Sequence, residues 1–163
     1  MVHPLRVAQV RPNETEDERA DRNFGDLLQE LRVAQTGVQI LFGFLLTIPL
    51  QARYTSLDGF HRNLLVAAVL LLAVATAFII APVAWHRALF RQQMKDEVVR
   101  VANRLAQVGL AALALGIVTS IVLMLDLVIS RGWALIAGGT IFTLLLMLWL
   151  VAPLSRRAGR RDR

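Results

Sequence analysis

The chain has 163 residues, and its 56% hydrophobic content and positive mean hydropathy exclude an ordinary soluble domain, in which each helix or strand keeps a polar face. The net charge of +6 does not indicate nucleic-acid binding, because no nucleic-acid motif and no basic face interleaved with aromatic residues accompanies it. Cysteine is absent, which excludes disulfides, thiolate metal sites and cysteine nucleophiles.

The N-terminal part of the chain divides into a polar segment and an amphipathic helix. Residues 1–19 are predicted to be disordered, because they are acidic and show no apolar period. A helix is predicted from Ala20, and we expect it to continue into a first membrane span at about residues 33–51, with Pro49 near its end. The apolar residues of the amphipathic part recur at helical spacing: Phe24, Leu27, Leu28 and Leu31.

Three further apolar stretches are each long enough to cross a bilayer, which takes roughly 20 helical residues. The predicted spans are about 64–85, 105–129 and 133–154. The predicted connections are a loop at 53–63 with the turn signal Asp58-Gly59, a polar helix at 86–104, and a tight turn at 130–132. A basic tail, residues 155–163, follows the last span, so the membrane domain is expected to occupy residues 20–154.

The two halves of the chain resemble each other at a shift of 72 residues. Arg32–Gly37 then falls on Arg104–Gly109, with four of six positions identical, and each half contains an amphipathic helix followed by two spans. We therefore predict an all-α polytopic membrane protein with four transmembrane helices, arranged as two tandem helical hairpins with cytoplasmic amphipathic extensions. Such hairpins are related by a pseudo-two-fold axis along the membrane normal.

The distribution of basic residues predicts the orientation in the membrane. The N-terminal segment, the middle connection and the tail together carry fifteen Lys and Arg residues, whereas the two short loops carry three. By the positive-inside rule, both termini are expected in the cytoplasm. The bias toward arginine, with Lys95 as the one lysine, is typical of GC-rich bacterial genomes, so we predict a bacterial plasma membrane.

Polar residues inside the spans are the candidates for function. Asp126 is the one acid in a predicted span, and an intramembrane carboxylate suggests a proton or cation site. The alternative is structural, because Asp126 lies in the last turn of its span, where it can reach water or pair with Arg53 or Arg131. We favour the structural alternative.

Three amides form the second candidate. Gln35, Gln39 and Gln107 are expected to face the bundle interior, because an amide in hydrocarbon needs hydrogen-bond partners. They are predicted either to line a polar site on the pseudo-symmetry axis or, as we prefer, to link helices by hydrogen bonds. Glycines within or beside the spans are expected to permit close helix approach: Gly37, Gly43, Gly109, Gly116, Gly138 and Gly139.

Two surfaces outside the spans could bind partners. Apolar residues at helical spacing in the cytoplasmic extensions form a candidate helix-contact surface: Phe24, Leu28, Phe90 and Met94. Arginines of the tail form a candidate contact with anionic lipid: Arg156, Arg157, Arg160 and Arg161.

Enzymatic and metal-dependent functions have no residues to support them. The three histidines, His3, His61 and His86, lie on different segments, so a metal site is not expected. No phosphate loop, nucleophile motif or pair of intramembrane carboxylates is present, and no cofactor is expected.

The stretch from Arg32 to Pro49 resembles a family of small actinobacterial membrane proteins that is catalogued as a domain of unknown function. The acidic prelude and the Ala81-Pro82 exit of the second span resemble the same family, and the resemblance covers about residues 14–155. Some members carry a sodium:proton antiporter label. Established antiporter folds are larger and place acids at the midplane on broken helices. The resemblance therefore implies an architecture and not a mechanism.

Two functions remain open from the sequence. The first is an integral membrane protein without catalytic activity that acts as an accessory or assembly subunit. Its expected partners are the lipid bilayer and either further copies of itself, in a homo-oligomer, or a larger membrane protein complex; no nucleic-acid partner is expected. The alternative is a small oligomeric transporter, or a cation/proton antiporter-like protein, that uses Asp126 and the intramembrane glutamines.

Overall fold

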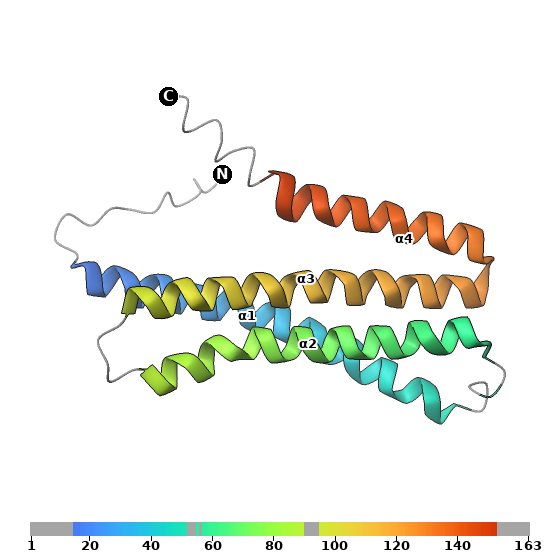
Figure 1. Ribbon diagram of the computed structural model, residues 1–163, viewed down its shortest axis with the longest axis horizontal. Coiled ribbons are helices and arrows are strands. Elements are labelled where there is room, and N and C mark those ends of the chain that lie inside the picture. Colours follow the sequence, from blue (N-terminus) through green and yellow to red (C-terminus); the bar gives the residue numbers. More distant parts are fainter. Residues whose placement is uncertain (1–14, 52–54, 56, 90–94, 153–163) are drawn as a thin grey trace, which may run out of the picture.

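The computed structural model describes residues 15–51, 55, 57–89 and 95–152, and almost all of these residues are helical. Four long helices run back and forth, with α1 and α3 running in one direction and α2 and α4 in the other (Figure 1). The helices are α1 (Glu16–Thr47), α2 (Gly59–Leu89), α3 (Lys95–Val128) and α4 (Arg131–Leu146), with a 3-10 turn η1 (Ile48–Leu50) after α1 and a π-helical segment η3 (Met147–Val151) after α4.

The described helices confirm the predicted all-α, four-span architecture. Each contains a stretch long and apolar enough to cross a membrane. A hydrocarbon core about 30 Å thick offers no water to unpaired backbone groups, so continuous helices are the expected solution. The membrane-length stretches are Phe24–Leu50, Gly59–Trp85, Arg100–Val128 and Arg131–Val151.

Three helices begin earlier than predicted, and side-chain caps account for two of these boundaries, at Thr15 and Asp58. The chain was expected to be disordered as far as residue 19, but α1 begins at Glu16, because Thr15 and Glu18 form a capping box. The hydrogen bond from the backbone N–H of Thr15 lowers the pKa of the Glu18 carboxyl. Likewise, α2 begins at Gly59 within the expected loop, and α4 begins at Arg131 within the expected turn.

The polar helix expected at 86–104 is not a separate element. α2 continues through His86 to Leu89, and α3 runs without interruption from Lys95 into its membrane stretch. Prolines mark the places where regular helix changes. Pro49 lies near the end of the first span, as predicted, and the chain forms a 3-10 turn there because proline cannot donate to the carbonyl four residues back. Pro82 lies within α2 and is fully buried.

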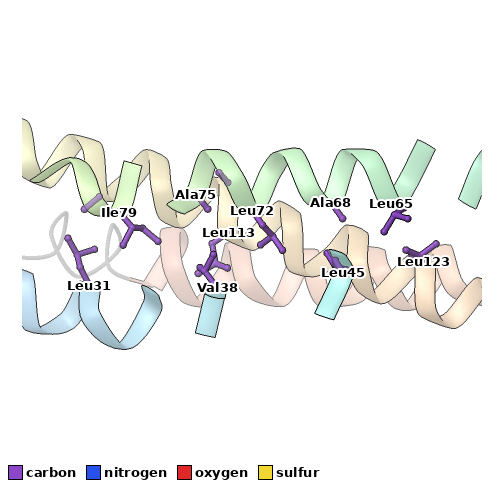
Figure 2. Packing of buried hydrophobic residues seen from close by; sticks show 12 residues of the cluster. Leu31, Val38, Leu45, Leu65, Ala68, Leu72, Ala75, Ile79, Leu113 and Leu123 are labelled. Carbon is purple, nitrogen blue, oxygen red and sulfur yellow. The ribbon is translucent and has the colours of Figure 1, made fainter. Parts of the chain in front are cut away.

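The core is built on a seven-residue repeat. α1 buries one residue every seven, namely Phe24, Leu31, Val38 and Leu45, and the last three face α2 and α3 (Figure 2). The buried positions of α2 alternate by steps of three and four, which is the pattern of knobs-into-holes packing between nearly antiparallel helices. These α2 positions are Leu65, Ala68, Leu72, Ala75, Ile79 and Pro82.

α2 and α3 form the closest pair, because glycines of α3 lie against large side chains of α2. A Cβ placed on Gly109 would lie 2.9 Å from Cγ1 of Ile79, and one on Gly116 would lie 2.7 Å from Cδ2 of Leu72. One heptad further along, Leu65 lies close to Leu123 (Figure 2). The predicted role of Gly109 and Gly116 in close approach is therefore confirmed.

α4 is the peripheral helix. Among the described elements it packs against α3, whereas α2 packs against both α1 and α3. Its buried residues are Ala134 and Gly138, and a Cβ on Gly138 would overlap the side chain of Val122. Equivalent hairpins would give α2 and α4 equivalent contacts, so the predicted tandem-hairpin arrangement is not confirmed and stays a prediction.

Candidate functional site

Four charged or titratable side chains meet at the end of the molecule where α2 begins, α3 ends and α4 begins. We call Asp58, His61, Asp126 and Arg131 the polar cluster. The antiparallel register of α2 and α3 explains why these side chains meet. Seven residues before Leu65 is Asp58, and seven residues after its neighbour Leu123 is Ser130, which directly precedes Arg131. The same seam that packs leucines therefore brings these polar side chains together.

Asp58 caps α2 and binds α4. Its Oδ1 accepts a hydrogen bond from the backbone N–H of His61 at 2.9 Å, as expected of an N-cap aspartate. Its Oδ2 accepts a hydrogen bond from Nη2 of Arg131 at 2.8 Å. The backbone N–H of His61, and then the Arg131 guanidinium, hold the pKa of the Asp58 carboxyl well below its usual range.

Asp126 is the most buried member of the polar cluster, with 4% of its side chain exposed. Its Oδ2 accepts a hydrogen bond from Nε of Arg131 at 3.2 Å and lies 3.1 Å from Nε2 of His61. The predicted pairing of Asp126 with Arg131 is thus confirmed, while Arg53 lies outside the described residues. A buried carboxylate held by a guanidinium is strongly anchored, because removing either partner leaves an uncompensated charge.

Arg131 joins all three helices of the cluster. Its guanidinium binds Asp58 at the start of α2 and Asp126 near the end of α3, and its carbon Cζ lies 4.0 Å from the centre of the Phe60 ring. A planar guanidinium suits this position, because it binds two carboxylates while stacking on an aromatic face.

His61 lies between the two carboxylates of the polar cluster. Its Nδ1 is 2.7 Å from Oδ1 of Asp58, its Nε2 is 3.1 Å from Oδ2 of Asp126, and 14% of its side chain is exposed. Both ring nitrogens are buried. They lie within ion-pair distance of the carboxylates, but their N–H bonds do not point at the oxygens as a hydrogen bond requires. The Phe60 ring meets the imidazole edge-on, at 6.2 Å between centroids.

The polar cluster shows no metal-binding geometry. Within the described part of the chain, no group of three His, Cys, Asp or Glu side chains is arranged to hold a metal ion. With both carboxylates ionised and His61 neutral, the cluster carries a net charge of −1, since Arg131 offsets one carboxylate. Protonation of His61 brings the net charge to zero.

The three glutamines do not form one interior site within a single chain. Gln39 and Gln107 are exposed, and Gln35 is half-buried. The expectation that all three face the bundle interior is therefore wrong for Gln39 and Gln107. The heptad explains the difference, because Val38 and Ala106 occupy the buried positions next to them.

The candidate helix-contact surface is already used inside the molecule, at least in its described half. Phe24 is buried and packs with Ala102 of α3, with Leu27 and Leu28 beside it. The extensions of α1 and α3 therefore touch each other. Phe90 and Met94 lie outside the described residues, as do the arginines of the candidate lipid contact: Arg156, Arg157, Arg160 and Arg161.

Comparison with known proteins places the chain in a family. The sequence model of a family of unknown function, DUF6328, matches residues 13–153. The chain belongs to the DUF6328 family. The match includes all four membrane-length helices and the whole polar cluster of this DUF6328 protein, and it confirms the resemblance to a family of unknown function. No curated protein and no solved structure matches the chain.

The sequence reasoning identified Asp126 in this DUF6328 protein but missed His61 and Asp58. His61 was set aside because no second histidine lies near it in the sequence. A signal was nevertheless present: Asp58 and His61 are three residues apart at the start of one span, and Asp126 and Arg131 flank the turn at the same predicted level of the membrane. An antiparallel alignment of the second and third spans brings the two pairs together.

Proposed function

We propose that this protein acts without catalysis, as an assembly or accessory subunit that binds other membrane helices through α4. The observation that carries the proposal is the packing of α4, which buries Ala134 and Gly138 against α3 and leaves most of its other apolar side chains exposed. Exposed apolar side chains alone do not indicate a protein partner, because lipid can cover them. A helix partner is favoured by the particular residues on the exposed face of α4.

The exposed face of α4 has the small and hydroxylated residues that are common where membrane helices associate. Gly139, Thr140 and Thr143 lie along it, and with their neighbours they line an open depression of about 650 Å³. The hydroxyl groups of Thr140 and Thr143 donate to carbonyls of the same helix, at 2.9 and 2.8 Å. They therefore bring no unsatisfied donor to an interface and still offer oxygen lone pairs to a partner.

The polar cluster supports this proposal over transport, because its charges are paired with one another across three helices. Asp126 is bound to Arg131 near a helix end, and the exposed Gln39 and Gln107 do not join it in one interior path. The partner in the proposal is a second copy of this chain or another protein of the same membrane.

The test is native mass spectrometry of the full chain, extracted gently from its own membrane, with two matched variants. Gly139→Leu adds bulk to the exposed face of α4, and Gly43→Leu adds the same bulk to α1; a Cβ meets no atom within 4 Å at either position. We expect a complex of fixed stoichiometry that is lost in Gly139→Leu and kept in Gly43→Leu. A monomeric wild-type chain, or a complex that both variants retain, would contradict the proposal.

A small proton- or cation-coupled transporter is the second candidate, favoured by the buried carboxylate of Asp126 beside His61. If the protein is such a transporter, reconstituted vesicles should show a proton- or cation-coupled flux that depends on Asp126. Equal flux from wild-type protein and Asp126→Asn, or no proton- or sodium-driven flux from either, would exclude this role.

A further inference from the structure

His61 is a half-buried titratable group, with both ring nitrogens shielded from solvent, that the assembly role does not use. Each ring nitrogen faces a carboxylate oxygen, Asp58 on one side and Asp126 on the other. A neutral imidazole has one N–H, so one of its nitrogens presents a lone pair to a carboxylate. An imidazolium carries a positive charge that attracts both carboxylates, whose oxygens lie 2.7 and 3.1 Å from its nitrogens without hydrogen-bond alignment. The two-sided placement of carboxylates therefore matches the protonated ring.

The charged groups around His61 come from α3, from α4 and from the residue that precedes α2. Asp58 precedes its own helix, Asp126 belongs to α3, and Arg131 of α4 binds both carboxylates. From α1 no titratable side chain is available, because residues 33–51 contain none. The lowered pKa of the Asp58 carboxyl keeps that group ionised at neutral pH.

We propose that His61 is a proton-binding site that controls the docking of α4 on the rest of the helix bundle. When His61 is protonated, the polar cluster is neutral and all its ion pairs are mutually supportive. When His61 loses the proton, the cluster carries one excess negative charge, and a lone pair of the ring faces a carboxylate. The ligand is the proton of the compartment at the α2–α3–α4 end of the molecule.

α4 is the element that responds, because Arg131 at its start is bound to both carboxylates of the polar cluster. The ion pair between Arg131 and Asp58 links α4 to α2, with which it shares no close backbone contact among the described residues. Against α3 it has Ala134, Gly138 and the ion pair of Arg131 with Asp126. Weakening the cluster therefore frees the start of α4 before it disturbs the α2–α3 pair. This inference goes beyond the assembly role and does not depend on it.

The experiment is a distance measurement between spin labels on the full chain in lipid nanodiscs, at about pH 5.5 and about pH 8.5, on either side of the usual histidine range. The chain has no cysteine, so labels attach only where cysteines are introduced. The test pair is Val66→Cys on α2 with Leu135→Cys on α4, and the control pair is Val66→Cys with Met124→Cys on α3; all three positions are exposed.

We expect the test pair to shift to longer and broader distances at the higher pH, while the control pair stays unchanged. His61→Gln, which cannot be protonated, should abolish the shift. If the control pair shows that His61→Gln disturbs the α2–α3 pair, His61→Asn replaces it. An unchanged test-pair distance at the two pH values, or a shift that persists in the His61 variant, would overturn the proposal.

Discussion

The two faces of α3 hold their neighbours in different ways. Toward α2, Gly109 and Gly116 let the helices approach until side chains of one lie against the backbone of the other. Toward α4, the contact consists of a short patch around Gly138 and an ion-paired cluster at one end. Close approach along a whole heptad seam distributes attraction over many contacts, whereas a terminal cluster concentrates it in a few charged groups. The contacts of the first arrangement are apolar, whereas those of the second include ionisable groups.

The largest expected effect is on the α2–α3 pair, from Gly109→Leu. A Cβ at this position would lie 3.1 Å from the backbone nitrogen of Ile79, so the helices must separate. We expect a loss of about 3 kcal/mol in the free energy of unfolding, at the upper end of overpacking costs. Denaturant unfolding in detergent micelles measures it. Gly37→Leu is the control, because a Cβ at Gly37 meets nothing within 4 Å. An equal loss of stability in this control would contradict the close packing of α2 against Gly109.

A smaller and more local effect is expected on the α3–α4 contact, from Gly138→Ile. The added side chain meets Val122, and α4 is free to move away because nothing described lies behind it. We expect a cost of about 1 kcal/mol, with faster hydrogen exchange confined to α4. Gly139→Ile, next to it in open space, should leave the exchange of the isolated protein unchanged. Faster exchange throughout α2 and α3 would show that α4 is not a separate unit.

The smallest effect expected is acid destabilisation through Asp58. Because its pKa is lowered in the folded protein, the Asp58 carboxylate contributes stability above the ordinary aspartate value of about 4, and this contribution is lost as the pH falls below it. The wild-type melting temperature should therefore fall between about pH 4 and pH 2. Asp58→Asn keeps an N-cap residue but removes the titrating group. The melting temperature of this variant should therefore be lower than that of the wild type at the higher pH, and should fall less as the pH is lowered. Parallel curves for both proteins would contradict this assignment.

The sequence was a good guide to the spans and a poor guide to their contacts. Hydropathy located four membrane-length helices, because an apolar run must be helical in lipid whatever it touches. The caps at Thr15 and Asp58 were readable in principle, since each is a short-range motif.

The unequal roles of α2 and α4 could not be read from the sequence. The two halves share the residues Arg32–Gly37 and Arg104–Gly109, and that similarity suggested equal packing. Contacts between helices depend on which faces of the helices meet. Sequence similarity over one or two helical turns does not determine how the remaining turns pack. For the same reason Asp126 was found as a single charge in a span, while its neighbour His61 became visible once the antiparallel register was known.

α1 and α3 are longer than a membrane requires. Their 32 and 34 residues correspond to rods of roughly 50 Å at 1.5 Å per residue, against a hydrocarbon core of about 30 Å. The contact of Phe24 with Ala102 lies at the start of the membrane-length stretch of each rod. Because each rod is unbroken, a displacement at one end moves the far end as well. α1 and α3 are therefore two stiff struts that run the whole length of the membrane domain.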